Sequence, residues 1–80
     1  MALQEKRKEK GWSQSQLAEI AGVNVRTLQF YEQGVKDVNG AKLNTLLSLA
    51  IALDCSIYDI VTNEELKGKI EIYRNVIGSF

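Results

Sequence analysis

Two short helical patterns meet at a tight turn within residues 13–34, SQSQLAEIAGVNVRTLQFYEQG, and this spacing constrains the fold more than any other feature. Each pattern begins after an N-cap residue, Ser13 or Asn24, whose side-chain oxygen can accept a bond from a free N–H of the first turn. Each pattern ends at a glycine, Gly22 or Gly34, because glycine adopts the left-handed backbone of a helix end without steric cost. The sequence therefore predicts helices over residues 14–21 and 25–33.

Apolar side chains recur where these two helices must pack against each other. In the first helix Leu17, Ile20 and Ala21 share one face, and in the second helix Leu28 and Tyr31 do the same. Two helices joined by so short a turn are typical of a helix-turn-helix, whose second helix can enter the major groove of DNA. The pattern therefore favours recognition of double-stranded DNA.

The composition argues against several other classes of function. The 80 residues suffice for one domain, and their 45% apolar content is typical of a small globular protein. With one cysteine and no histidine, the chain lacks the ligands of a structural zinc site and the usual base of a catalytic triad. We expect no enzyme activity, no cofactor and no metal site. No apolar run suits a membrane span and no secretory signal accompanies KRKEK, so we expect a cytoplasmic protein.

Charge is the property that weighs against DNA binding. The net charge is zero, and the pI near 6.2 lies below the basic values usual for DNA-binding domains. Residues 1–42 carry seven basic and five acidic side chains, a net +2, whereas the remainder carries three basic and five acidic, a net −2. We therefore expect weak non-specific binding to DNA that salt reduces steeply.

Three further helices are expected outside this pair. Residues 3–10 form the first, which Gly11 closes. The next begins near residue 43 and ends at Asp54, and Ser56 can cap a short helix after it. The helix that begins near residue 43 has the clearest apolar stripe, formed by Leu43, Leu46, Leu47, Ala50 and Ile51.

Residues 63–80 are compatible with two conformations. Their apolar residues recur at the heptad spacing of a helix, yet KIEIY alternates with a period of two, and Gly68 weakens a helix by roughly 1 kcal/mol. Helix and strand therefore both stay open. Either form leaves apolar side chains uncovered, so we expect this segment to contact a second copy or to brace the core. The heptad positions are Leu66, Ile70, Tyr73, Ile77 and Phe80.

Several motifs of the chain form one long, specific pattern: GWSQ at 11–14, QLAEIAGV at 16–23, the spacing of Leu28, Tyr31, Glu32 and Gly34, and TLLSLAIALDCSIYDI at 45–60. With these motifs, the chain from about residue 3 to residue 61 resembles the lambda-repressor-like or XRE family of five-helix DNA-binding domains. This resemblance implies an all-α domain over residues 1–62, with residues 63–80 as a C-terminal extension. It also implies a dimeric transcriptional regulator, usually a repressor, whose helix 25–33 reads bases.

Four residues of the helix 25–33 are expected to contact bases. Leu28 and Tyr31 must point inward, so residues 25, 26, 29, 30 and 33 share the outward side. Arg26 can pair with a guanine and Gln29 with an adenine, each contributing about 1–3 kcal/mol of discrimination. Val25 or Phe30 can contact a thymine methyl group. Phe30 has an alternative, which is to pack against the loop 34–42.

Phosphate contacts are expected near the helix N-termini, where free N–H groups attract anions. Gln14, Ser15 and Asn24 occupy such positions, although each can serve simply as a cap. Lys10 is the member of KRKEK that we expect to reach a phosphate. The resemblance adds Lys36 as a backbone contact, gives Gln14 a supporting role, and pairs Arg7 with Glu32 in a structural salt bridge.

Two classes of function therefore stay open. The first is a sequence-specific regulator, a repressor that binds a two-fold operator as a homodimer. The alternative is a protein-interaction module with the same fold, such as an antitoxin or an adaptor that binds a partner protein. Neutral charge and the apolar tail favour the alternative, and the helix 25–33 favours the regulator.

Overall fold

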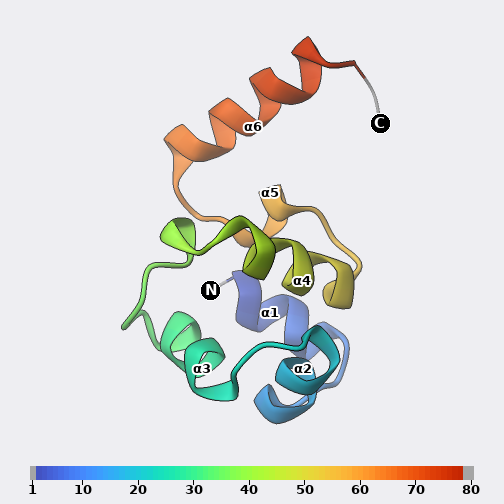
Figure 1. Ribbon diagram of the computed structural model, residues 1–80, viewed down its shortest axis with the longest axis vertical. Helices are drawn as coiled ribbons and strands as arrows, with labels where there is room; N and C mark the ends of the chain where they lie inside the picture. The colour runs from blue at the N-terminus through green and yellow to red at the C-terminus, as the bar shows by residue number, and fades with distance from the viewer. Residues whose placement is uncertain (1, 79–80) are drawn as a thin grey trace.

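The protein is all-helical in the computed structural model, which describes residues 2–78 (Figure 1). Helices joined by turns and short irregular segments make up this range, and no strand occurs in it. The last of the heptad positions, Phe80, lies outside the described residues. The elements in chain order are α1 (Ala2–Glu9), α2 (Gln14–Ala21), α3 (Val25–Gln33), the short 3-10 helix η1 (Val38–Gly40), α4 (Leu43–Leu53), α5 (Ile57–Ile60) and α6 (Glu64–Val76).

The ends of α2 and α3 are fixed by the caps that the sequence predicts. The Ser13 hydroxyl accepts the backbone N–H of Gln16 at 3.1 Å, and the Gln16 side chain accepts the backbone N–H of Ser13 at 2.8 Å. This reciprocal pair is a capping box. Asn24 accepts the backbone N–H groups of Arg26 and Thr27, and Gly22 closes α2 with a φ of +70°. Local hydrogen bonds thus set the register of both helices.

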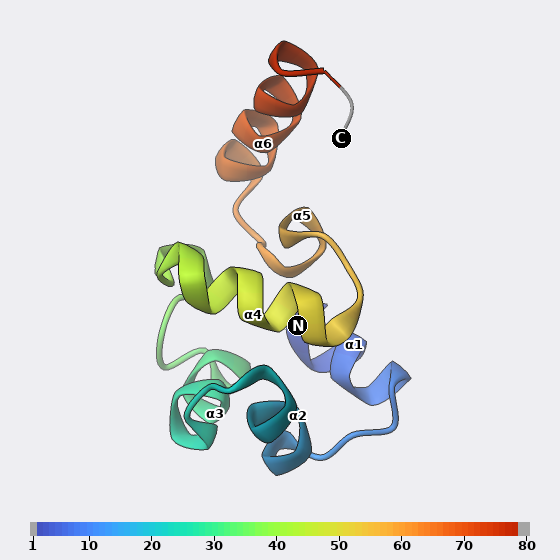
Figure 2. The same ribbon diagram turned by 45° about the vertical axis from the view of Figure 1, so that its right-hand side comes forward.

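The core lies where the helices α1 to α5 meet. Helix α4 packs against α2 on one side and α5 on the other, while α5 also packs against α1 and α3 packs against α2 (Figures 1 and 2). Burial of these aliphatic side chains is the main driving force for folding. The most deeply buried side chains are Leu3, Leu17, Leu28, Val38, Leu49, Ile60 and Val61.

The apolar stripe predicted for α4 is partly wrong. Leu46 and Ala50 are buried as expected, but Leu43, Leu47 and Ile51 are exposed, the last of them at 79%. The core instead takes Leu49 and Leu53 from the neighbouring face. Large aliphatic residues occur on both faces of this helix, so helical periodicity alone does not select which face is buried. The exposed positions form an uncovered row along α4.

The face predicted for α2 is also partly wrong. Leu17 is fully buried, but Ile20 is 53% exposed, and the small Ala18 takes its place against the neighbouring helices. Packing two helices closely requires a small residue at the point of contact, and Ala18 provides it.

Helix α6 settles the open conformation of the C-terminal segment in favour of a helix. Asn63 caps it by accepting the backbone N–H of Leu66 at 2.9 Å. The helix stands away from the other five and extends the long axis of the molecule to 37 Å (Figures 1 and 2). It has no buried residue; Leu66 and Ile70 pack against the core, and the cationic groups of Lys67 and Arg74 lie over the Tyr58 ring of α5.

Asn39, which lies in η1, joins the loop after α3 to the segment before α6. Its side-chain oxygen accepts the backbone N–H groups of Thr62 and Asn63 at 2.8 and 3.0 Å. Its amide nitrogen donates to Asp37 and to the Thr62 hydroxyl. The loop that follows α3 is therefore anchored to the body of the protein at its far end.

We expect Leu17→Ala to destabilise the protein by about 2–5 kcal/mol, because it leaves a cavity in the core. The matched substitution Ile20→Ala, on the same helix, should cost less than about 1 kcal/mol because that side chain is half exposed. Urea unfolding of both variants measures the difference. Equal losses would contradict the observed orientation of α2.

The cap of α5 predicts a pH effect. Asp59 accepts hydrogen bonds from the backbone N–H and the hydroxyl of Ser56, and these bonds lower the pKa of its carboxyl group. Its contribution to stability is therefore complete above the unfolded-state pKa of about 3.9, and is lost as the pH falls through the lower folded-state pKa. The stability difference between the wild type and Asp59→Asn should shrink between about pH 5 and pH 3. A difference that stays constant over this range would exclude the effect.

Candidate DNA-binding surface

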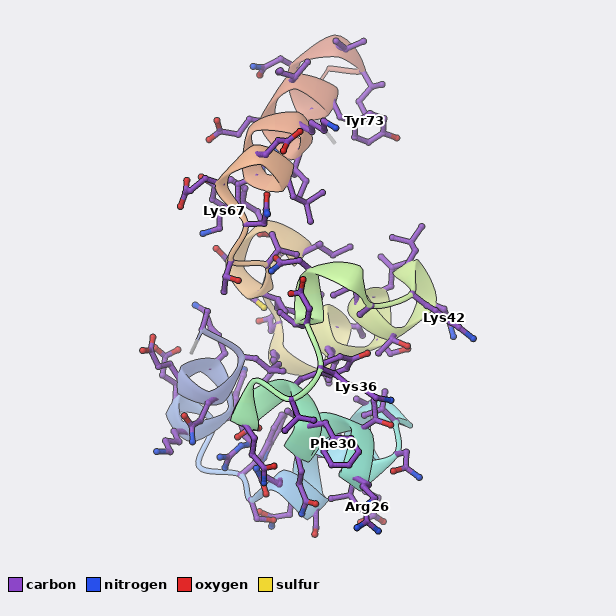
Figure 3. All side chains as sticks on the ribbon, turned by 90° about the vertical axis from the view of Figure 1, so that its left-hand side faces the viewer. Arg26, Phe30, Lys36, Lys42, Lys67 and Tyr73 are labelled. Atoms are coloured by element: carbon purple, nitrogen blue, oxygen red, sulfur yellow. The ribbon has the colours of Figure 1, made fainter. Side chains whose placement is uncertain are left out.

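Helix α3 presents an uncovered face next to the loop that follows it. Leu28 and Tyr31 are buried behind it, whereas Val25 and Arg26 are exposed and Gln29 is half-buried. Figure 3 shows the side chains of Arg26, Phe30 and Lys36 on the same side of the molecule, from α3 and its following loop. The structure thus brings together the four residues that the sequence predicts as base contacts, with Lys36 beside them.

The ring of Phe30 contacts two cationic side chains of this face, Arg26 and Lys36. Its ring lies 5.9 Å from the Arg26 guanidinium carbon and 5.7 Å from the Lys36 ammonium, measured to the ring centroid. The backbone N–H groups of Val35 and Lys36 both bond to the carbonyl of Phe30, which holds the loop against the end of α3. Each cation–π contact is worth about 0.5–1 kcal/mol at an exposed site. The ring therefore contacts the loop and holds two positive charges side by side.

The back of α3 is held by an ion pair that is almost completely removed from water. Two nitrogens of Arg7, Nε and Nη2, each donate to a carboxylate oxygen of Glu32 at 2.9 Å. The third nitrogen, Nη1, donates to the carbonyl of Trp12 at 2.7 Å. Gln14 completes the group by donating its amide N–H to Glu32 at 3.1 Å. This network joins α1, the start of α2 and the end of α3.

The predicted phosphate contacts differ in how the structure uses them. Gln14 is half-buried and donates to Glu32, and the oxygen of Asn24 caps α3, so both side chains already have a structural partner. Ser15 lies exposed in the first turn of α2. Lys10 is exposed just after α1, and no hydrogen bond or ion pair between residues 2 and 78 ties its side chain to α3. Lys36 is the predicted phosphate contact that lies directly beside the α3 face.

The groups with shifted pKa values lie elsewhere, around α5. Burial raises the pKa of the Cys55 thiol, and the nearby carboxylates of Asp59 and Asp54 raise it further. Glu71 raises the pKa of the Tyr58 hydroxyl. A thiol with a raised pKa stays protonated at neutral pH and reacts slowly, which suits a cysteine that fills space. No cluster of metal-binding side chains occurs in the part of the chain that the structure describes.

The fold and this surface define a helix-turn-helix domain that binds DNA. The chain belongs to the helix-turn-helix family of the XRE, lambda-repressor-like type, since the model of that family matches residues 3–60. This family comprises DNA-binding regulatory domains. Neither the curated proteins nor the solved structures include a match to the chain. Between residues 2 and 78, no helix is long and apolar enough to cross a membrane.

Asn39 is the residue of this region that sequence reasoning missed. It anchors the loop that carries Lys36, through hydrogen bonds to residues more than twenty positions away. In the sequence, the loop 34–42 carries only the turn signals of Gly34 and Gly40. No local pattern marks such a long-range contact.

We expect Glu32→Gln to destabilise the protein by about 3–5 kcal/mol, because it leaves the buried charge of Arg7 without a counter-charge. Gln14→Ala is the matched change in the same network. It should cost only about 1 kcal/mol, since Arg7 and Glu32 stay paired. Urea unfolding separates the two cases. A loss for Glu32→Gln as small as that for Gln14→Ala would show that the ion pair is not needed.

Proposed function

We propose that the protein is a sequence-specific transcriptional regulator, a repressor that binds a two-fold operator as a homodimer and reads bases through α3. One observation carries the proposal. The face of α3 that bears Arg26, Gln29 and Phe30 is uncovered, while the opposite face is held by the core and by the buried Arg7–Glu32 pair. A helix fixed from behind and polar in front is the arrangement that major-groove recognition needs.

The chemistry of this face suits the edges of base pairs. A guanidinium group donates two parallel hydrogen bonds to a guanine, and a glutamine amide both donates to and accepts from an adenine. Arg26 and Gln29 supply these groups on successive turns of α3. Val25 and Phe30 supply apolar contacts for thymine methyl groups. The ring of Phe30 also holds Arg26 from the side, which reduces the conformational freedom that the arginine must lose on binding.

The phosphate contacts that we propose surround this face. Lys36 reaches the backbone from the loop, and the starts of α2 and α3 offer free N–H groups to phosphate oxygens. These contacts position the protein and carry no sequence information. The number of phosphates that these contacts neutralise decides how strongly binding depends on salt. The proposed phosphate contacts are Gln14, Ser15, Asn24, Lys36 and Lys10.

A homodimer would supply the sequence discrimination that a single domain lacks. One small, neutral domain reads only a few base pairs, which gives little discrimination against the rest of a genome. Two copies related by a two-fold axis place their α3 helices in successive major grooves, about 34 Å apart. An operator for this protein should therefore be two-fold symmetric, with half-sites one helical turn apart.

The second candidate function is a protein-interaction module, such as an antitoxin or an adaptor. It is favoured by the exposed apolar side chains of α4 and α6, among them Leu43, Ile51, Ile72 and Val76. Such a module would use α4 and α6 for its partner, and its α3 face would not contact bases. The two candidates differ in whether α3 determines a DNA sequence.

Selection of binding sites from a pool of random duplexes tests the proposal. We expect the wild type to recover a two-fold site, and Gln29→Ala to lose the preference at one position in each half-site. Lys69→Ala is the control, since Lys69 lies on α6 at the other end of the molecule (Figure 1). Recovery of no sequence above background at low salt would contradict the proposal and leave the protein-interaction module.

We expect Arg26→Ala to weaken binding to the selected operator about 10–100-fold, and to relax the preference for guanine at one position. Lys69→Ala removes the same charge and should weaken binding much less, because it lies far from the proposed contacts. Titration of a labelled duplex at two salt concentrations measures both effects. Equal losses for the two variants would indicate that charge alone, and not α3, determines binding.

A further inference from the structure

The side-chain amide of Asn39 bonds to two parts of the chain that are distant in sequence. Its oxygen accepts the backbone N–H groups of Thr62 and Asn63 at 2.8 and 3.0 Å, and its nitrogen donates to the Thr62 hydroxyl at 2.9 Å. The same nitrogen donates to the carboxylate of Asp37 at 2.8 Å. An amide has two donor hydrogens and two acceptor positions, so these bonds use the whole capacity of the side chain. Neither an apolar side chain nor a carboxylate can make the same set.

The segment that receives Asn39 is itself firmly placed. Val61, directly before this segment, is fully buried in the core. Asn63 caps α6 by accepting the backbone N–H of Leu66 at 2.9 Å, and Thr62 lies between these two fixed points. Figure 1 shows the loop after α3 running up to the place where the chain enters α6. Asn39 therefore ties this loop to a support that the core holds in position.

Lys36 lies between two points at which the same loop is attached. Before it, two backbone N–H groups of the loop, including its own, donate to the carbonyl of Phe30 at 2.9 and 3.2 Å. After it, Val38 is buried in the core and Asn39 makes its bonds to the segment before α6. The Lys36 side chain is exposed, with its ammonium 5.7 Å from the centroid of the Phe30 ring. The attachments on both sides determine where its backbone lies.

Asp37 follows Lys36 directly and carries the opposite charge. It is the only acidic residue of the loop 34–42. Its carboxylate accepts the backbone N–H and the side-chain N–H of Asn39 at 3.0 and 2.8 Å. Asp37 and Asn39 line a recess of about 350 Å³ whose other wall is the start of α6, whereas Lys36 lies beside Phe30 of α3 (Figure 3). Asn39 thus holds the carboxylate on the α6 side of the loop and leaves the ammonium on the α3 side.

A phosphate contact is stronger when the cation is already in place and no carboxylate faces the same phosphate. Ordering a flexible loop and a lysine side chain on binding costs conformational entropy, which weakens the complex. A carboxylate that faces the DNA repels the phosphates that the ammonium attracts. Both costs are smaller when the loop is fixed, with its carboxylate held on the α6 side, before DNA binds.

We propose that Asn39 is a positioning residue for DNA binding, which fixes the loop so that Lys36 faces a phosphate and Asp37 faces α6. Asn39 lies outside the proposed contacts and acts through Lys36. The inference rests on the proposed function, in which Lys36 contacts the DNA backbone, and adds a residue that touches neither base nor phosphate. Because phosphate contacts carry no sequence information, Asn39 determines the strength and the salt dependence of binding and not its sequence preference.

Titration of a labelled duplex at several salt concentrations tests the proposal. We expect Asn39→Ala to weaken binding about tenfold at low salt, and to reduce the slope of log K against log salt by about 0.9, the value for one phosphate contact. Lys36→Ala should give the same two changes. Because both substitutions remove the same contact, the double variant should be at most about twofold weaker than Lys36→Ala alone. Full additivity of the two losses would overturn the proposal.

Asn63 offers a matched control for each variant of Asn39. Asn63→Ala removes an asparagine side chain at the same junction but keeps the backbone N–H that Asn39 accepts. Asn39→Asp keeps the acceptor oxygen, removes both donors and places a second carboxylate beside Asp37, whereas Asn63→Asp adds the same charge nearby and can still cap α6. We expect both Asn39 variants to weaken binding, and both Asn63 variants to stay within about twofold of the wild type. Equal losses at the two positions would overturn the proposal, since charge or local stability would then explain them.

Hydrogen exchange of the free protein measures the attachment without DNA. The backbone N–H groups of Thr62 and Asn63 bond to Asn39, so we expect both to exchange about tenfold faster in Asn39→Ala and at the wild-type rate in Lys36→Ala. Unchanged exchange in Asn39→Ala would overturn the proposal. If circular dichroism shows that Asn39→Ala does not fold, Asn39→Asp and its control Asn63→Asp decide the question through the titration.

Failure of this inference and failure of the proposed function give different results. A wild type that binds no duplex at low salt refutes the regulator, and the positioning role with it. A wild type that binds DNA and is weakened by Lys36→Ala but not by Asn39→Ala refutes the positioning role alone, and leaves DNA recognition by α3 standing.

Discussion

The buried pair of Arg7 and Glu32 is the interaction on which the rest of the site depends. Burying two charges costs free energy, and this cost is offset only when their hydrogen-bonding groups find partners in good geometry. Here the guanidinium group bonds to both carboxylate oxygens and to the Trp12 carbonyl, and Gln14 adds a further donor. These bonds are directional, so they fix the end of α3 relative to α1 and α2 more tightly than apolar packing would. The opposite face of α3 stays free because every one of these contacts lies behind it.

The two ends of the molecule differ in chemistry. At the α3 end, the ring of Phe30 holds Arg26 and Lys36 beside each other, and Asn39 anchors the loop that carries Lys36. At the other end, α6 stands off the core and exposes apolar side chains such as Ile72 and Val76. The α3 end thus holds two neighbouring positive charges beside an uncovered helix face, and the α6 end exposes apolar surface. This separation lets a protein of zero net charge carry two different surfaces in 80 residues.

Much of this arrangement could be predicted from the sequence, and the exceptions have physical causes. Cap residues determine the ends of α2 and α3 because their hydrogen bonds are local. The buried face of α4 could not be predicted, because apolar residues on both of its faces fit a helical period equally well. The conformation of α6 stayed open, since KIEIY fits a strand and the wider heptad pattern fits a helix. Asn39 and the Arg7–Glu32 pair act over long sequence separations, so only the family resemblance pointed to the ion pair and nothing pointed to the asparagine.

The central claim is that DNA lies against the front of α3. Backbone amide shifts of the labelled full chain, recorded by NMR while a random-sequence duplex is added at low salt, test it most directly. Non-specific binding suffices for this measurement, because phosphate contacts use the same face as base contacts. The account predicts the largest changes over residues 13–16 and 24–36, with residues 64–76 little affected. Changes concentrated on α6, or no changes at all at low salt, would contradict it.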